Sequence, residues 1–500
     1  MSAFLRALEI ALMAAPVVPL MRLFRIEGFV LGFGRIAATL AVLILIYLGG
    51  IAIIALFLPA VLPLLSAFVA AGLAVAYWFS RASYGTARGL PPGSLSLVAS
   101  LEAIFDHRFY LKQARRHGPV FKMMQFNKPL VCVVGLEKGH ELIHQPDDIL
   151  GPAPQPFSAE IPGGFLRYME PDTHAAYALK FRTAFSRNVT TAAEPVVREA
   201  IRSELERMAK DSRSNGGTQP SAYMQRAMFV SFARLIFGFT PESDEMKSFR
   251  ETCRLFDAQD LAQPLSSETR KALSELRSQV LRQIDWLREN SSEECVLTEW
   301  LRANRGTPDQ TVLDNFLFLF RIGVNNVSSL LRWVLKMLGD HPEWGERVRG
   351  EENAVEQSAL AERIVMETLR LEQSEYIYRV VKRTMAIDEY QIPPGWRFRL
   401  CVRESHRDPT IFESPDSFDP DRFLDRKGNR SEYSPFGTDR HACIAVQSSH
   451  AVAQTLVEEL ARNYRWSVTC DGPRERPPRH WHHWEPSSRF ALSLSRIPSI

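Results

Sequence analysis

A long helical pattern begins at Thr307 and constrains the fold more than any other part of the sequence. Thr307 can cap the helix, Pro308 suits its first turn, and Gln310 stands where a capping box has Glu or Gln. Apolar residues then recur at helical spacing at Leu313, Phe316, Leu317, Phe320, Val324, Val327, Leu331 and Leu335. Gly339 and Pro342 supply the stop. Roughly thirty residues at 1.5 Å each span about 45 Å, which is enough to cross a whole domain.

The remainder of the chain beyond residue 93 is also mostly helical in pattern. Further helices are predicted at Ala361–Leu371 and Ala445–Arg462, and polar breaks fall at Ser212–Gln219 and Ser291–Glu294. Strand-like segments are Tyr376–Thr384, Trp396–Val402 and Arg489–Ser495. A turn at Tyr390–Gly395 separates the first two. We therefore expect a mainly α fold with a small β region.

The N-terminal part contains no charged residue from Ile36 to Ser80. This stretch is about twice the roughly 20 residues that cross a bilayer. Pro59 and Pro63 fall near its middle, and arginines flank it on both sides. A hairpin of two spans keeps both basic flanks in the cytoplasm, so residues 36–80 are predicted to form a multi-pass transmembrane anchor. One long tilted span remains the alternative.

The anchor divides the chain into four parts. Residues 1–35 are apolar but interrupted by charges, as in a segment that lies in the membrane interface. Residues 81–93 form a linker that ends in the stiff sequence GLPPG. Residues 94–500 then form one catalytic domain, which is predicted to face the cytoplasm.

Charge and cysteine content exclude two classes of protein. The net charge of +3 is small for 500 residues, and nothing indicates the basic face that nucleic-acid binding requires. The six cysteines show neither a CxxC pair nor a zinc-like spacing. We expect reduced thiols rather than a disulfide framework, and five of them are interpreted as small buried hydrophobic residues. The sixth is Cys443.

The segment Phe436–Ala445 reads FGTDRHACIA and places Cys443 directly before an apolar helix. A thiolate at a helix N-terminus is stabilised by the positive end of the helix dipole and by backbone N–H groups. These conditions suit a cysteine that stays deprotonated as the axial ligand of a haem iron. Arg440 and His441 can offer positive charge or donors to the haem propionates. By itself, a buried cysteine before a helix is more often structural.

Three further motifs precede this loop. Glu367 and Arg370 are three residues apart, so they face the same side of a helix and can pair. An isolated pair of this kind is usually a solvated salt bridge of little energetic value. The other motifs are Ser405–Pro409, which reads SHRDP, and Phe418–Phe423, which reads FDPDRF. Their order ahead of a cysteine loop is hard to obtain by chance.

Taken together, these motifs resemble those of the cytochrome P450 family. Phe436 takes the place of the aromatic residue seven positions before the haem ligand, His441 that of the basic residue two positions before it, and Cys443 that of the ligand. Asp439 and Ala445 stand where the family usually has glycine. The resemblance implies the cytochrome P450 fold, with one haem b.

The resemblance covers about residues 90–500 and is strongest from Thr307 onward. It implies that Glu367, Arg370 and Arg422 form a buried charge triad behind the haem. It also implies a substrate pocket above the haem, with walls at Gly151–Tyr168, Phe320–Val327 and Glu375–Val380. In a membrane-bound enzyme this pocket is expected to take a lipophilic small molecule.

Propionate contacts are also implied by the resemblance. Pro171–His174 is similar to the start of the family's third main helix, where a basic residue four positions on usually contacts a propionate. Here that position is Ala178. The candidates in its place are Lys180, Arg182 and His174. Arg379 is a further candidate, because an arginine begins the corresponding strand in relatives.

The predicted long helix departs from the family at one functional position. A glycine inside a helix often marks a close approach, and Gly323 is expected to let the helix lie against the distal face of the haem. In most monooxygenases of the family an acid and a threonine follow, and they relay protons to iron-bound dioxygen. Here those positions hold Asn325 and Asn326, which cannot supply a proton by titrating. The alternative is that both amides only hydrogen-bond to the backbone.

The sequence thus leaves three functions to compare. The first is a monooxygenase whose electrons come from a separate reductase or ferredoxin, since the chain has no flavin or iron–sulfur segment. The second is a reductant-independent isomerase, dehydratase or atom-transfer enzyme that acts on an O–O or N–O bond, which the Asn325–Asn326 pair favours. The third is a catalytically silent haem-binding or scaffold protein. The protein is expected to be monomeric and to bind no nucleic acid.

Overall fold

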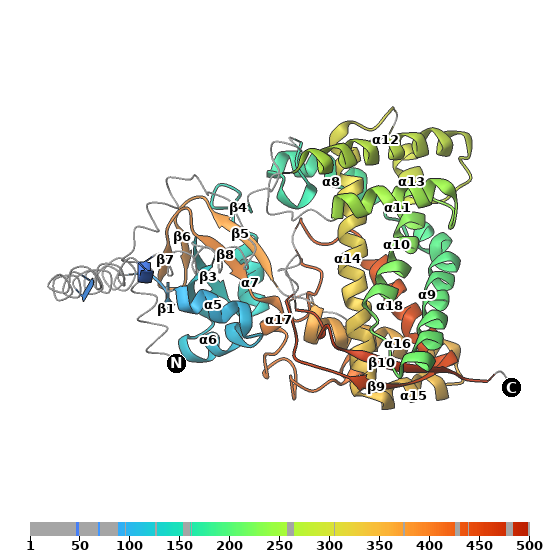
Figure 1. Ribbon diagram of the computed structural model, residues 1–500. Helices are drawn as coiled ribbons and strands as arrows, with labels where there is room; N and C mark the ends of the chain where they lie inside the picture. Colours follow the sequence, from blue (N-terminus) through green and yellow to red (C-terminus); the bar gives the residue numbers. More distant parts are fainter. Residues whose placement is uncertain are drawn as a thin grey trace.

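The protein consists of a strand-rich part and a larger helical part that lie side by side (Figure 1). The computed structural model describes residues 47–49, 69–70, 89–95, 97–125, 128–153, 161, 163–257, 265–304, 306–373, 376–425, 431–438, 440–476 and 484–498. The strand-rich part lies at the N-terminal side of the described chain and also receives strands from residues 377–400. The expectation of a mainly α fold with a small β region is confirmed.

A six-stranded mixed sheet organises the strand-rich part. Its strands, in spatial order, are β1 (Gly93–Ser94), β2 (Val120–Gln125), β3 (Lys128–Val133), β8 (Arg397–Leu400), β5 (Ile377–Val381) and β4 (Leu150–Pro152). The pairs β1/β2 and β3/β8 are parallel and the others are antiparallel. Side chains of β3 alternate between the two faces: Leu130 and Cys132 join one apolar cluster, and Val131 and Val133 join another.

Three short helices and two small ribbons complete the strand-rich part and the C-terminal region. The helices are α5 (Leu97–Phe105), α6 (Phe109–His117) and α7 (Leu136–Ile143). The ribbons pair β6 (Met385–Ile387) with β7 (Tyr390–Ile392), and β9 (Tyr464–Cys470) with β10 (Ala491–Arg496). The apolar residues of β6, β7 and the sheet form one cluster, so the first ribbon packs on the sheet.

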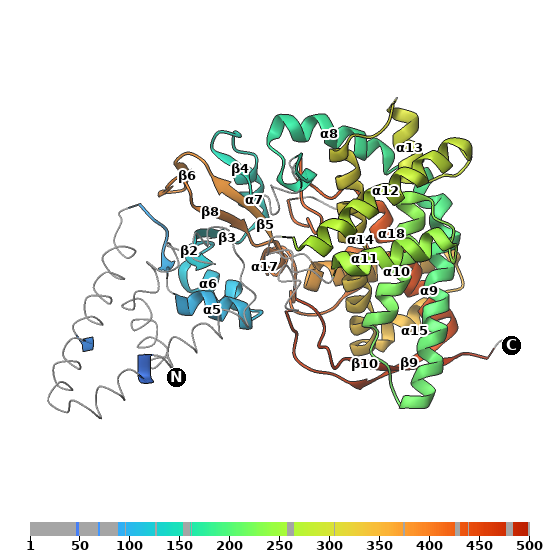
Figure 2. The same ribbon diagram turned by 45° about the horizontal axis from the view of Figure 1, so that its top comes forward.

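The helical part surrounds the long helix α14 (Gln310–Asp340), which runs between the sheet and α9 and α10 in Figure 1. The other helices are α8 (Pro171–Ala184), α9 (Arg187–Asn215), α10 (Ser221–Phe237), α11 (Asp244–Asp257), α12 (Ser267–Glu289), α13 (Val296–Ala303), α15 (Pro342–Gly350), α16 (Ala354–Thr368), α17 (Val402–Ser405) and α18 (Val446–Asn463). Short 3₁₀ helices are η2 (Leu166–Tyr168) and η4 (Pro420–Phe423), and η3 (Leu369–Gln373) is a short π-helix that continues α16. Figure 2 shows α10, α11 and α12 grouped around α14. The main apolar core lies among these helices.

The predicted long helix is present, but it starts three residues later than predicted. Its N-cap is Asp309, whose carboxylate accepts a hydrogen bond of 2.8 Å from the N–H of Val312. Thr307 and Pro308 therefore precede the helix, and the prediction that Thr307 caps it is wrong. A carboxylate also complements the positive end of the helix dipole, which a threonine hydroxyl does not. The end at Asp340, between Gly339 and Pro342, agrees with the sequence.

The other predicted helices and strands are present with shifted bounds. The turn predicted at Tyr390–Gly395 is wrong in its first half, because Tyr390–Ile392 forms strand β7. The helix predicted at Ala361–Leu371 begins earlier, at Ala354, because Asn353 caps it through the N–H groups of Val355 and Glu356. Of the five cysteines interpreted as buried, four are buried and Cys470 is exposed on β9. All six cysteines are free thiols, as expected.

The predicted anchor at residues 36–80 lies almost entirely outside the described residues, as does the segment 1–35. No helix in the described part of the chain is both long enough and apolar enough to cross a bilayer. Of the predicted linker 81–93, the structure describes only the last five residues, 89–93, which lead into β1.

Asn315 of α14 fixes the segment Gly163–Tyr168 against the long helix. Its side chain is completely buried, and its Oδ1 accepts a hydrogen bond of 2.8 Å from the N–H of Leu166. Its Nδ2 donates to the carbonyls of Gly164 and Thr311, at 2.9 and 2.8 Å. A Cβ atom at Gly163 would overlap the Thr311 side chain, so only glycine allows this close approach. One wall of the predicted substrate pocket is thereby attached to α14.

We predict that Asn315→Leu lowers the free energy of unfolding by about 2–4 kcal/mol, because it leaves the buried N–H of Leu166 and the carbonyl of Gly164 without partners. Thermal melting followed by circular dichroism measures the change. Asn290→Leu is the matched control, because Asn290 lies at an exposed helix end and its side chain donates to one carbonyl among the described residues, that of Trp286. Equal losses in the two variants would contradict the prediction.

Candidate active site

The cysteine loop is held in shape by its own backbone. The N–H of Cys443 donates to the carbonyl of Phe436 at 2.9 Å, which closes the loop. Gly437 makes this turn possible because its φ of 80° is unfavourable for other residues. The ring of Phe436 packs at 5.3 Å from the ring of His450 on α18, and the main core also contacts Phe436. The loop therefore places Cys443 just before the first turn of α18.

The thiol of Cys443 is accessible, although many protein atoms surround it. Burial raises the pKa of this thiol, whereas the N–H of Ala445 and the positive charge of Arg167 act in the opposite direction. An accessible sulfur that receives a backbone N–H group at a helix start suits a thiolate ligand. The residues present thus fit a haem, which when bound would supply the iron for oxygen or peroxide chemistry.

The residues beside Cys443 differ in how they are arranged. His441 packs against His174 of α8, with ring centroids 4.1 Å apart. His174 is buried, so this contact joins α8 to the cysteine loop. Arg440 is bound by Asp147 through a hydrogen bond of 2.9 Å and an ion pair. The predicted roles of all three residues toward the propionates stay predictions, and that of Arg440 would have to compete with Asp147.

The other propionate candidates lie on two elements. Arg182 of α8 donates to the carbonyl of Arg440 and so reaches the cysteine loop, whereas the amine of Lys180 lies 5.3 Å from the ring of Tyr177. Arg379 is buried on β5, and its Nη1 donates to the carbonyl of Tyr378 at 2.8 Å. The structure therefore brings Arg182, and not Lys180, to the loop.

The predicted charge triad is assembled and removed from solvent. Arg370 binds Glu367 through two hydrogen bonds, of 2.7 and 2.8 Å, and Arg422 binds the same carboxylate at 3.0 Å. Glu367 and Arg370 are completely buried and Arg422 is 8% exposed. The alternative interpretation, a solvent-exposed salt bridge between Glu367 and Arg370, is therefore wrong. The N–H of Asp419 completes the carboxylate's shell at 3.0 Å.

Sequence reasoning missed the role of His406, which lies in the SHRDP run. The Nε2 atom of this completely buried ring accepts a hydrogen bond of 3.0 Å from the N–H of Ser434, two residues before the cysteine loop Phe436–Ala445. The carbonyl of His406 accepts from Arg370 at 2.8 Å. Burial and the charges of Arg370 and Arg407 lower the pKa of His406 to about 3. A neutral His406 thus connects the charge triad to the cysteine loop.

The Asn325–Asn326 pair lies in an unbroken part of α14. Both side chains are partly buried, and the carbonyl of Asn325 accepts from the hydroxyl of Ser328 at 3.0 Å. A Cβ atom at Gly323 would stand 2.6 Å from the ring of Phe232 on α10. The glycine is therefore needed for the packing of α10 on α14, and its predicted role toward the distal face of the haem stays a prediction.

The described parts of the predicted pocket walls contain aromatic side chains that pack against other aromatic rings. Phe165, from the segment held by Asn315, stacks on Phe318 of α14 with centroids 3.9 Å apart. Phe320 contacts Phe229, Phe237 and Phe249 edge-on or tilted, so this face of α14 belongs to the core. Residues 154–160, 162 and 375, which complete the predicted walls, lie outside the described residues.

Comparison with known families and proteins agrees with this arrangement. The family described as "Cytochrome P450" matches residues 93–488. The chain is 24% identical to abscisic acid 8'-hydroxylase 2 of Arabidopsis thaliana, over 76% of this chain and 85% of that protein. It is 25% identical to cytochrome P450 26A1 of Xenopus laevis, over 82% of this chain and 92% of that protein.

Solved structures show the same fold. A cyanobacterial cytochrome P450, CYP120A1, with retinoic acid bound superposes with a TM-score of 0.67 at 21% identity, covering 82% of this chain and all of that chain. A variant of cytochrome P450 OleT in complex with arachidonic acid superposes with a TM-score of 0.62 at 16% identity, covering 78% of this chain and 95% of that one.

We predict that Glu367→Gln prevents accumulation of folded protein loaded with haem. The substitution leaves two buried guanidinium groups without their counter-charge, which costs about 3–5 kcal/mol. The yield of soluble protein and its haem content measure the effect. Asp285→Asn is the control, since Asp285 also pairs with an arginine three residues away, Arg288, but both side chains are exposed. If the two variants behave alike, the triad does not stabilise the fold.

We also predict a pH effect that originates at His406. Its pKa is about 3 in the folded protein and 6.5 in an ordinary histidine, so the unfolded chain binds the extra proton between these values. The folded protein is therefore most stable with respect to His406 above pH 6.5, where the ring is neutral in both states. Its free energy of unfolding decreases as the pH falls from 6.5 toward 3, because only the unfolded chain takes up the proton. The variant His406→Gln keeps an acceptor for the N–H of Ser434, because the glutamine amide oxygen can take the place of Nε2. In this variant, the slope of the free energy of unfolding against pH should fall by about 1.4 kcal/mol per pH unit.

Urea unfolding between pH 7 and 5 measures this slope in the two proteins. Burial also lowers the pKa of His107 and of His450 to about 4, and both remain in the variant. The difference between the two curves therefore isolates His406. An unchanged slope would show that His406 is not neutral in the folded state.

Proposed function

Because this chain belongs to the cytochrome P450 family, we propose that it is a monooxygenase that hydroxylates a lipophilic small molecule. The observation that carries the proposal is the position of Cys443, an accessible thiol in a closed backbone loop just before the start of α18. Relatives such as abscisic acid 8'-hydroxylase 2 are hydroxylases, which supports the oxygenase reaction. Membership of the family implies a haem iron with a thiolate ligand, and we propose haem b with Cys443 as that ligand.

The aromatic walls of the predicted pocket and the names of the relatives both support a proposed substrate class. Phe165, in the segment that Asn315 holds, stacks on Phe318 of α14, so the predicted wall is aromatic at this point. Large flat or branched apolar molecules gain most from such a surface. The molecules named with the relatives are abscisic, retinoic and arachidonic acid, so lipophilic carboxylic acids are the class to test first.

Two further parts of the proposal concern the surroundings of the enzyme. We propose that a separate reductase or ferredoxin supplies electrons. We also propose that residues 36–80 anchor the catalytic domain at the cytoplasmic side of a membrane, where a lipophilic substrate would concentrate; the support is the charge-free length of this stretch with arginines on both flanks.

The Asn325–Asn326 pair favours a second candidate function, rearrangement or dehydration of a substrate with a weak O–O or N–O bond. An amide can donate and accept hydrogen bonds, but it cannot titrate to deliver a proton. Monooxygenase turnover would then depend on water or on the substrate for its protons, whereas an isomerase needs none from outside. The monooxygenase stays the first proposal because the named relatives are hydroxylases.

We predict that the purified, reduced protein under carbon monoxide shows the red-shifted Soret band of a thiolate-ligated haem. Cys443→Ser should abolish this band and the turnover. Cys470→Ser is the control, because Cys470 is also an exposed thiol but lies on β9, away from the loop. An unchanged spectrum and full turnover in Cys443→Ser would refute the proposal.

Turnover conditions separate the two candidate functions. Product formation that consumes NADPH and dioxygen, with a reductase added, supports the monooxygenase. Turnover of a hydroperoxide under anaerobic conditions without reductant supports the isomerase. Asn326→Thr should raise oxygen-dependent turnover about tenfold or more if proton delivery limits the monooxygenase.

A further inference from the structure

One side of α14 stays partly accessible in the middle of a helix that is otherwise buried. Between residues 316 and 328, the buried side chains share the other side of the helix, and they are Phe316, Leu317, Phe320, Val324, Val327 and Ser328. Phe318, Ile322 and Asn325 are partly accessible and follow one another at spacings of four and three residues. This spacing places them in line along the helix, so we call them the accessible stripe of α14. Side chains on this stripe are available to a ligand.

The accessible stripe is apolar at two of its three positions. Phe318 and Ile322 do not belong to the main apolar core of the described residues. Phe318 stacks on Phe165 with ring centroids 3.9 Å apart. Arg167 lies two residues after Phe165, and its charge acts on the thiol of Cys443. Because such effects are short-ranged, the segment that contains Phe165 and Arg167 links the accessible stripe to the side on which Cys443 lies.

The third position of the stripe holds the side-chain amide of Asn325. This amide forms no hydrogen bond with any described residue. The backbone carbonyl of Asn325, and not its side chain, accepts from the hydroxyl of Ser328 at 3.0 Å. The alternative interpretation, that both amides of the pair only hydrogen-bond to the backbone, is therefore wrong for Asn325. Its two N–H donors and its acceptor oxygen can meet a ligand that lies on Phe318 and Ile322.

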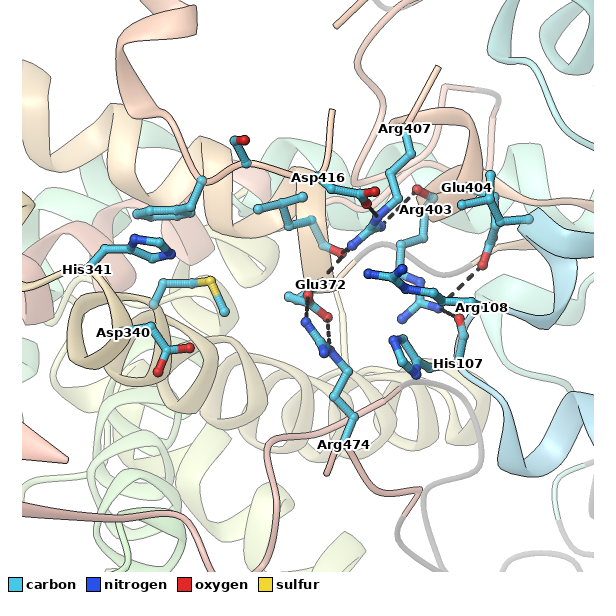
Figure 3. Close-up of a pocket in the computed structure, with 15 residues that line it drawn as sticks. His107, Arg108, Asp340, His341, Glu372, Arg403, Glu404, Arg407, Asp416 and Arg474 are labelled. Atoms are coloured by element: carbon cyan, nitrogen blue, oxygen red, sulfur yellow. Dashed lines mark hydrogen bonds and ion pairs between the residues drawn. The ribbon is translucent and has the colours of Figure 1, made fainter. Parts of the chain in front are cut away.

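The cavity at the C-terminal end of α14 offers no comparable surface. Its volume is about 280 Å³, and Figure 3 shows charged side chains around it. Its carboxylates are set against as many arginines, and these residues are Asp340, Glu372, Glu404, Asp416, Arg108, Arg403, Arg407 and Arg474. An apolar molecule in this cavity would displace water from the charged groups without replacing its hydrogen bonds. A lipophilic ligand is therefore expected on the accessible stripe rather than here.

We propose that Asn325 selects the substrate, by hydrogen-bonding to an oxygen group of a lipophilic molecule whose apolar part lies on Phe318 and Ile322. This role rests on the proposed function, because it concerns the substrate of the same site. The amide both donates and accepts, so it can hold a carboxylate, a carbonyl or a hydroxyl oxygen. A site that hydrogen-bonds to its substrate discriminates strongly against an analogue without the polar group, because the polar group of the site is then left unpaired.

The test uses the full-length, haem-loaded protein in detergent and three probes with the same carbon chain: dodecanoic acid, 1-dodecanol and dodecane. Equilibrium dialysis with labelled probes gives their dissociation constants without turnover. At least one of the two oxygen-bearing probes is expected to bind more tightly than dodecane. The probe with the larger gain identifies the oxygen group as a carboxylate or a hydroxyl. If neither binds more tightly than dodecane, the proposal is overturned.

Asn325→Leu removes the amide and keeps a side chain of similar size. The preference over dodecane should fall about three- to tenfold for the alcohol, or more than about tenfold for the acid, because a hydrogen bond to a charged group is the stronger one. The affinity for dodecane should not fall. Partition of the probes into detergent is the same for every variant, so it cancels in this comparison.

Asn290→Leu is the matched control, because it makes the same substitution at an exposed helix end and should leave the preference unchanged. An equal loss of affinity for all three probes in Asn325→Leu would overturn the proposal, since it would indicate a structural role. Asp416→Asn tests the cavity of Figure 3, where the Asp416 side chain is 52% exposed. A change of preference in Asp416→Asn as large as that in Asn325→Leu would also overturn the proposal.

The Soret band of the reduced protein under carbon monoxide tests the proposed function separately. If the band of a thiolate-ligated haem is absent, the proposed function fails, whatever the probes do. If the band is present and Asn325→Leu keeps the preference of the unmodified protein, only the role of Asn325 fails.

Discussion

The ion pairs of buried Glu367 with Arg370 and Arg422 are the interaction on which the rest of this structure depends. Charges removed from water are expensive, and they are tolerated only when every oxygen and N–H group has a partner. Arg370 therefore also collects backbone carbonyls from the segment that follows the sheet, including that of His406. His406 in turn accepts the N–H of Ser434. The geometry of the cysteine loop is thus set by a charge that lies in another helix.

Much of this could be predicted from the sequence, because the motifs are local and their chemistry is distinctive. Short local patterns predict each of three features: the long helix, the cysteine loop and the Glu367–Arg370 pair. The start of α14 was misplaced because Thr307 and Asp309 are both good caps, and only the fold decides which of them meets a free N–H group. The contact of Gly323 with Phe232 joins two helices and has no local signature.

Partners that lie far apart in the chain account for the rest. Asp147 engages Arg440 although about 290 residues separate them, so the sequence gives no sign that this cation is already bound. The hydrogen bond from the N–H of Ser434 to His406 also joins residues that are distant in the sequence, so no local pattern predicts it. Electrostatic roles of this kind are decided by tertiary contacts, whereas helical periodicity and motif order are not.

The side chain of Asn315 has a consequence for the middle of the long helix. Its amide accepts from the N–H of Leu166 and donates to the carbonyl of Gly164, and both of these groups lie outside α14. It also donates to the carbonyl of Thr311 within the helix. The helix can therefore neither slide nor rotate about its axis without breaking these bonds. Asn325 lies ten residues further on, roughly three turns along the same rigid rod. The direction of the Asn325 side chain around the helix axis is therefore fixed by the hydrogen bonds of Asn315. A substitution at position 325 or 326 therefore changes the chemistry of the side chain while the direction in which it points stays constant.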